Sequence, residues 1–146
     1  MKNTQHMPVY APTDPDESMD AIGQRIQHLA LERPDHIALI DGETQLNWPA
    51  LVRQANRIAN RLRSAGLEQG DAVAGLSENS IHYVALYLGT LVAGGCMVPL
   101  SGMASGDSLA LMLNDCRARF LFVSKKNIEL FEGTADKLDT LGRDQC

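Results

Sequence analysis

The stretch from Gly70 to Leu100 constrains the fold of this chain more than any other part. It holds a short apolar run, a turn, a longer and almost wholly apolar segment, the pair Gly94-Gly95 and a second short apolar run. Runs of strand length on either side of an apolar segment of helix length predict two buried strands and a buried helix. Parallel strands need such a crossover connection. The stretch therefore predicts one βαβ unit, with Ser77 or Asn79 as the N-cap of its helix.

A helix and a hairpin are predicted near the N-terminus. Ser18 can cap a helix that ends before Pro34, because the residue before a proline is disfavoured in the α region. Two short strand-like runs, 36–40 and 44–48, then lie around Asp41-Gly42, a pair that is typical of tight hairpins. The predicted buried face of the helix consists of Ile22, Ile26, Leu29 and Ala30.

A second helix is predicted to begin at Pro49 and to end at Gly66 in a left-handed C-cap, with Leu67 packed back onto its last turn. We expect this helix to lie on the sheet with its arginines in water. Its apolar face consists of Leu51, Ala55, Ile58 and Leu62, and its arginines are Arg53, Arg57, Arg61 and Arg63.

Three further elements are predicted after the βαβ unit. Ser105 and Asp107 open a fourth helix, the run Phe120 to Ser124 forms a third parallel strand, and 127–142 form a broken helix or a helix and a loop. The inner side of the fourth helix is predicted to carry Leu109, Met112, Leu113 and Cys116.

These elements predict an α/β fold: a three-layer-like parallel sheet flanked by helices, with a short N-terminal β-hairpin. Residues 1–17 are interpreted as a flexible tail and residues 18–146 as one truncated subdomain of a larger enzyme. The segment from Tyr83 to Gly106 has no charged side chain, but Gly94-Gly95 and Pro99 interrupt it. A buried helix and strand therefore explain it better than a membrane span does, and we expect a soluble, cytoplasmic protein.

Composition excludes several classes of function. A net charge of −5 without a basic stripe argues against a nucleic-acid partner. The three cysteines, Cys96, Cys116 and Cys146, have neither metal-site nor disulfide spacing. Cys96 and Cys116 lie in apolar segments, where burial would make a thiol inert. Cysteines buried in the core are therefore expected.

The sequence lacks the common phosphate and nucleophile motifs. It contains no GxxxxGK[ST] loop, no GxGxxG between strand and helix and no GxSxG elbow. The loop Ser101 to Asp107 could hold an anion, although an ordinary loop with Ser105 as the helix cap explains it better. The remaining polar groups are interpreted as scattered histidines (His6, His28, His36, His82) and a solvated acidic run (Asp14, Asp16, Glu17).

Taken in order, these segments resemble the first subdomain of the adenylate-forming (AMP-binding) ligases, which include the acyl-CoA synthetases. The likeness covers about Ile22 to Ser124 and rests on eight elements rather than on one diagnostic motif. They are Pro34-Asp35, Ala38-Leu39, Asn47 to Leu51, Asn56-Arg57, Gly70-Asp71, Asn79, Ala93-Gly94 and Val98-Pro99-Leu100. Ser101-Gly102 stands where the family usually has Asn-Pro or Asp-Pro, which favours the acyl-CoA synthetases over the peptide synthetases.

The resemblance implies a ligation in two steps. A carboxylate attacks the α-phosphate of Mg-ATP to give an acyl-adenylate and pyrophosphate, and a thiol such as coenzyme A then displaces AMP. The family's catalytic and ATP-binding motifs follow this subdomain, so we predict no catalytic, cofactor-binding or metal residue here. ATP, Mg and coenzyme A are expected for the full-length enzyme only, and none is expected to bind this chain tightly.

Three interpretations remain open. The first is an inactive N-terminal piece of an acyl-activating ligase, which predicts exposed apolar surface and possible homo-oligomers. The second is a free-standing small-molecule binding or assembly module that uses the strand C-termini. The third is an unrelated Rossmann-like protein. The acyl substrate, the acceptor thiol and the oligomeric state are not determined by the sequence.

Overall fold

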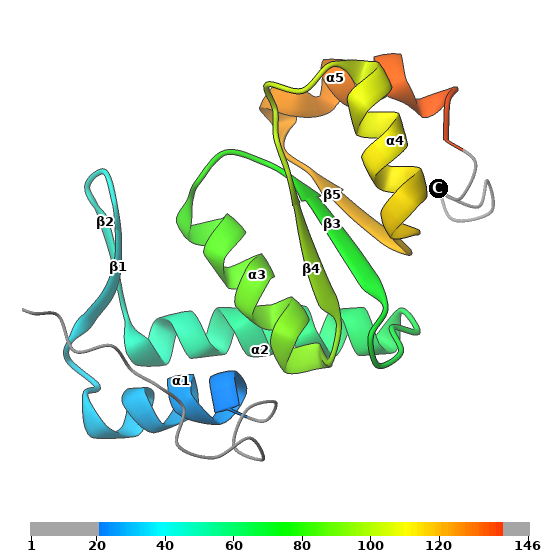
Figure 1. Cartoon of the computed structure of the whole chain (residues 1–146). Coiled ribbons are helices and arrows are strands. Elements are labelled where there is room, and N and C mark those ends of the chain that lie inside the picture. The colour runs from blue at the N-terminus through cyan, green and yellow to red at the C-terminus, as the bar shows by residue number, and fades with distance from the viewer. Residues whose placement is uncertain (1–20, 139–146) are drawn as a thin grey trace, which may run out of the picture.

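A computed structural model describes residues 21–138 of the chain (Figure 1). The predicted tail at 1–17, the cap Ser18, and His6 and Cys146 lie outside the described residues. In chain order the elements are α1 (Ala21–Glu32), β1 (Ile37–Asp41), β2 (Thr44–Asn47), α2 (Trp48–Ser64), β3 (Ala72–Leu76), α3 (Ile81–Ala93), β4 (Cys96–Leu100), α4 (Gly106–Cys116), β5 (Phe120–Val123), a 3-10 turn η2 (Lys125–Asn127) and α5 (Ile128–Ala135).

The three parallel strands form one sheet, as the sequence predicts, and their order in it is β4-β3-β5. β3 is central and is buried along almost its whole length, because strands flank it and helices cover both faces (Figure 1). β4 is an edge strand. This position tolerates Pro99, which lies opposite Gly75 and needs no donor on its outer side.

Two apolar cores lie on opposite faces of the sheet, which confirms the three-layer α/β class. One core, beneath α2 and α3, includes Val73 and Leu86. The other, beneath α4 and α5, includes Ala74 and Leu109. Val73 and Ala74 contribute to different cores because successive side chains of a strand point to opposite faces.

Helix α2 packs mainly against α3, and its C-terminal half shares a core with the sheet, on which the sequence predicts it to lie. The two helices approach most closely at Gly89. A Cβ on Gly89 would lie 2.7 Å from Ile58 Cβ and 2.8 Å from the carbonyl oxygen of Ala55. Farther along α2, Ala59 belongs to the same core as Val73 of the sheet. The pattern of the sequence therefore identified the buried face of α2 but not the element that covers it.

Hydrogen bonds define both ends of α2. The side chain of Asn47 accepts from the backbone N–H of Ala50 at 3.0 Å, so Trp48 begins the helix and is not the last strand residue that the sequence predicts. The predicted left-handed glycine is confirmed, because Gly66 has φ +85°. Leu67 N–H donates to Leu62 at 2.9 Å, which is the bond expected in a Schellman motif.

Helix α3 is capped by Ser80, so the prediction of Ser77 or Asn79 is wrong. Ser80 has extended backbone and its Oγ accepts from the N–H of Tyr83 at 3.1 Å. Asp41 at the tip of the hairpin accepts from the N–H of Ile81 at 3.2 Å. A side chain from a distant hairpin therefore occupies part of the helix N-terminus. Gly94 ends the helix with φ +93°, as the Gly-Gly pair predicts.

The remaining elements follow the sequence closely. The hairpin turns at Gly42 with φ +57°, and β1 carries an irregularity between Ile37 and Leu39. Ser105 caps α4 as predicted, but Met112 is 37% exposed, because the buried stripe of α4 is centred on Leu109, Ala110 and Leu113. No helix within residues 21–138 is long and apolar enough to span a bilayer.

Candidate functional site

The carboxyl ends of β3, β4 and β5 meet at one edge of the sheet (Figure 1). Open parallel sheets bind ligands beyond this edge. Three loops gather here, one after each strand. We call their interacting residues the carboxyl-edge cluster: Ser77, Glu78, Gly102, Ser124, Lys126 and Asn127.

Glu78 is the ionisable centre of this cluster. A hydrogen bond from its own backbone N–H lowers the pKa of its carboxyl group most, and a hydrogen bond from Ser124 and the charge of Lys126 lower it further. Ser77 Oγ lies 3.4 Å from a carboxylate oxygen of Glu78. The side chain is therefore a carboxylate over a wide pH range, which suits ion pairing and not the donation of a proton.

Asn127 joins the other two loops. It is 9% exposed, and its Nδ2 donates to Ser124 Oγ at 2.9 Å. A Cβ on Gly102 would lie 2.6 Å from Asn127 Oδ1, so the side chain of Asn127 approaches the backbone of Gly102 closely. The loops after β4 and β5 are therefore in contact at this point.

The loop Ser101 to Asp107 uses its donors internally. Ser101 Oγ accepts from the N–H of Met103 at 3.2 Å, and the carbonyl of Ser101 accepts from Ala104 at 3.1 Å. Ser105 Oγ accepts from Ser108 at 3.2 Å. These bonds support the interpretation as an ordinary strand-to-helix loop in which Ser105 caps α4.

A second charged cluster lies at the opposite, amino end of the sheet. Asp71 accepts from the backbone N–H of Glu68 at 2.8 Å, and this bond is the largest of the causes that lower the pKa of Asp71. Arg119 adds an ion pair to Asp71 at 2.7 Å and one to Glu68 at 3.7 Å. The cluster ties the start of β3 to the start of β5, and we assign it a structural role.

The cysteines and histidines form no common site in the part of the chain that the structure describes. Cys96 is exposed, so the prediction that it is buried is wrong; it starts an edge strand. Cys116 is half-buried. His28 lies on the surface of α1 as predicted, 3.4 Å from Glu32. Between residues 21 and 138, no group of three His, Cys, Asp or Glu side chains could hold a metal ion.

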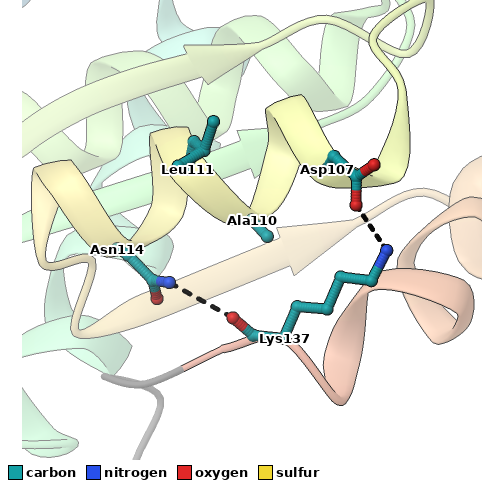
Figure 2. Close-up of a pocket in the computed structure, with 5 residues that line it drawn as sticks. All are labelled: Asp107, Ala110, Leu111, Asn114 and Lys137. Carbon is teal, nitrogen blue, oxygen red and sulfur yellow. Dashed lines mark hydrogen bonds and ion pairs between the residues drawn. The ribbon is translucent and has the colours of Figure 1, made fainter.

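A small pocket of about 300 Å³ lies between α4 and the turn after α5 (Figure 2). An ion pair from Lys137 to Asp107 crosses one end, and Asn114 Nδ2 donates to the carbonyl of Lys137 at 3.2 Å. The pocket wall also includes Ala110 and Leu111. Its polar side chains bond to one another, so we interpret the pocket as the space left where α4 packs against the turn after α5.

A family model and several individual proteins match this chain, and they point to one family. The family described as "AMP-binding enzyme" matches residues 26–144. Bacitracin synthase 1 of Bacillus licheniformis is 31% identical over 73% of this chain and 2% of its own length. The 3-hydroxybenzoate--CoA/4-hydroxybenzoate--CoA ligase of Thauera aromatica is 29% identical over 86% of this chain and 24% of its own length.

Solved structures of CoA ligases have a similar fold. The structure of a Mycobacterium tuberculosis fatty acyl CoA synthetase superposes with a TM-score of 0.79 at 22% identity, over 87% of this chain and 26% of that chain. The chain thus spans about a quarter or less of the length of these relatives. Peptide synthetases and CoA ligases both match, so these comparisons do not separate the two branches.

Proposed function

This chain belongs to the AMP-binding enzyme family, and from that premise we propose that it is the N-terminal α/β part of an ATP-dependent ligase that joins a carboxylic acid to a thiol. The family match over residues 26–144 carries the proposal, because it includes every strand and both cores. In the proposed reaction a carboxylate oxygen attacks the α-phosphorus of ATP, pyrophosphate leaves, and a thiolate then displaces AMP from the acyl carbon.

The part of this chain in that enzyme is a scaffold. ATP and its magnesium ion need amide or lysine donors around phosphate and carboxylates around the metal. Among residues 21–138 no group of three His, Cys, Asp or Glu side chains could hold the metal, and Glu78 is engaged by Ser124. We therefore derive no chemical step from them, and the prediction of no catalytic residue in this chain stays a prediction.

For the substrate we propose an acyl or aryl acid and coenzyme A as the thiol, in the cytoplasm. The likeness to a hydroxybenzoate--CoA ligase and to a fatty acyl CoA synthetase supports this choice. Amino acids are the competing class, since Bacitracin synthase 1 also matches.

The test is the native mass followed by an exchange assay. Antibody capture from the source cells and intact-mass measurement compare the native species with 15.9 kDa. We expect a several-fold heavier protein that catalyses ATP–pyrophosphate exchange with fatty or hydroxybenzoic acids, and no exchange by the 146-residue chain alone. A native species of 15.9 kDa without exchange would refute the proposal, whereas exchange with amino acids alone would refute only the substrate class.

The alternative of a free-standing binding module would place its ligand at the strand C-termini. At this edge Asn127 is engaged by Ser124 and lies against Gly102, an arrangement that gives that alternative no specific support. A native species of 15.9 kDa would nevertheless make it the next hypothesis to test by ligand screening.

A further inference from the structure

The parallel sheet has two outer edges, and only one of them is protected. β4 forms one edge and β5 the other. Pro99 removes a backbone donor from β4, a device that limits the pairing of an edge strand with another chain. β5 has neither a proline nor a charged side chain, and its Phe122 is 41% exposed. Among the described residues β5 pairs with β3 alone, so its outer edge is open to a further strand.

The N-terminal hairpin has a second open edge. Within residues 21–138 β1 pairs only with β2, so one side of its backbone has no strand partner. Ile37 is 46% exposed and Ile40 is 68% exposed. Figure 1 shows the hairpin projecting away from the parallel sheet and far from β5, so these two edges can pair only between two copies of the chain. A two-stranded hairpin is only marginally stable in water, and a further strand stabilises it.

The charges at the ends of the two strands have opposite signs. Acidic residues lie at both ends of β1 and basic residues at both ends of β5. All of them are exposed: Asp35, Asp41 and Glu43 around β1, and Arg117, Arg119, Lys125 and Lys126 around β5. Several of them (Asp35, Glu43, Arg117 and Lys125) take part in none of the ion pairs found within residues 21–138. The charges of one strand therefore complement those of the other.

The positions of these charges select the antiparallel direction. When 37–40 pair antiparallel with 120–123, Asp35 lies opposite Lys125 at one end of the pairing. At the other end Asp41 and Glu43 lie opposite Arg119 and Arg117. In the parallel direction only Glu43 would lie opposite a basic residue, Lys126. Opposite charges that face each other across two strands stabilise the pairing.

The same charges disfavour the pairing of either strand with itself. Antiparallel pairing of β5 with β5 of another copy would place Arg117 opposite Lys126. Antiparallel pairing of β1 with another β1 would bring Asp35 close to Asp41. Like charges on facing strands destabilise a pairing, so each strand is better matched by the other than by a copy of itself.

We propose that β1 of one copy of this chain adds antiparallel to the outer edge of β5 of a second copy, so that the hairpin extends the parallel sheet. Such strand addition takes its affinity from main-chain hydrogen bonds and its specificity from side chains. Because two different strands form the interface, the association is head-to-tail and gives a closed ring or a longer row of copies. The proposal goes beyond the proposed enzymatic function and does not rest on it.

Reversing the charges of one strand at a time tests the pairing. The first variant combines Asp35→Lys with Glu43→Lys, and the second combines Arg117→Glu with Lys125→Glu. Sedimentation velocity at low salt, over a range of concentrations, measures the mass of the species formed. We expect the unchanged chain to associate beyond the 15.9 kDa monomer. Each variant alone should remain a monomer, because the ends of its β1 and β5 then carry charges of the same sign.

Mixing the two variants restores the complementary charges and should restore association. The reversed hairpin of the first variant then meets the reversed ends of β5 in the second, and the unchanged hairpin of the second meets the unchanged β5 of the first. Matched controls reverse exposed charges elsewhere, Asp115→Lys with Glu132→Lys for the first variant and Arg57→Glu with Arg61→Glu for the second. These controls should associate like the unchanged chain. A monomer at every concentration would overturn the proposal, as would controls that dissociate as fully as the variants or a mixture that stays monomeric.

Backbone amide exchange in the unchanged chain gives a readout that needs no variant. The amides of 37–40 and 120–123 should exchange more slowly as the concentration rises, because strand pairing protects them. Those of β4, the edge that contains Pro99, should not change. Slowing at 120–123 without any at 37–40 would identify self-pairing of β5 and would contradict the proposal.

Discussion

Gly89 is the position where one added methyl group should do the most damage. It lies in the middle of α3 at the crossing with α2, and a Cβ there would meet Ile58 at 2.7 Å and the backbone oxygen of Ala55 at 2.8 Å. A backbone oxygen cannot rotate away, so Gly89→Ala must push the two helices apart. Overpacking of this kind costs about 1–3 kcal/mol.

The higher helix preference of alanine opposes this cost and reduces the net loss of stability. Alanine favours a helix over glycine by about 1 kcal/mol. The net destabilisation expected for Gly89→Ala is therefore up to about 2 kcal/mol. With a urea m-value of about 2 kcal/mol/M, the unfolding midpoint should fall by up to about 1 M. Circular dichroism at the helix band during a urea titration measures it.

Gly133→Ala is the matched control. Gly133 also lies inside a helix, α5, but nothing lies within 4 Å of where its Cβ would be, and its φ is not positive. In Gly133→Ala only the higher helix preference of alanine acts, so the free energy of unfolding should rise by up to about 1 kcal/mol. If both substitutions raised the midpoint, the close contact between α2 and α3 would not exist and the argument from packing would fail.

Three other substitutions test separate features. Thr90→Val should raise the melting temperature, because the Thr90 hydroxyl is fully buried with no hydrogen-bond partner among residues 21–138. A buried hydroxyl without a partner costs about 1–3 kcal/mol of stability. An unchanged or lower melting temperature would contradict this prediction. Asn47→Ala should cost about 1 kcal/mol in urea unfolding through loss of the α2 cap, with Asn47→Asp retaining most of it. The pKa of Asp107 lies below its usual range because Lys137 donates to and attracts the carboxylate, so this pair stabilises the fold above the unfolded pKa and loses its effect as pH falls through the folded pKa. Lys137→Met should return the NMR-titrated pKa of Asp107 towards its usual value, and no movement would refute the pairing.

The sequence predicted most helices and strands correctly, because the features that mark them lie close together in the chain. The apolar run at β3, the Gly66 C-cap and the Ser105 cap each depend on residues within one or two turns. The cap of α3 was wrong for the same reason: three candidates lie within four residues, and Ser80 is favoured partly because Asp41 from a distant hairpin bonds the next amide.

Properties set by strand order or helix packing could not be predicted. Cys96 lies in an apolar run, yet β4 is an edge strand and the residue is exposed. Strand order depends on which faces and edges find partners, and an apolar run has the same pattern in either position. The carboxyl-edge cluster was missed likewise, because Glu78 and Ser124 come from loops that only the parallel sheet brings together.

The carboxyl-edge cluster links the loops that follow the three parallel strands. Glu78, Ser124, Asn127 and Gly102 join the three loops at the edge where parallel sheets bind ligands, and they do so through their own hydrogen bonds and contacts. These contacts hold the loops in place at this edge of the sheet. The likeness to the AMP-binding family covers residues 26–144 and therefore includes every strand and both cores.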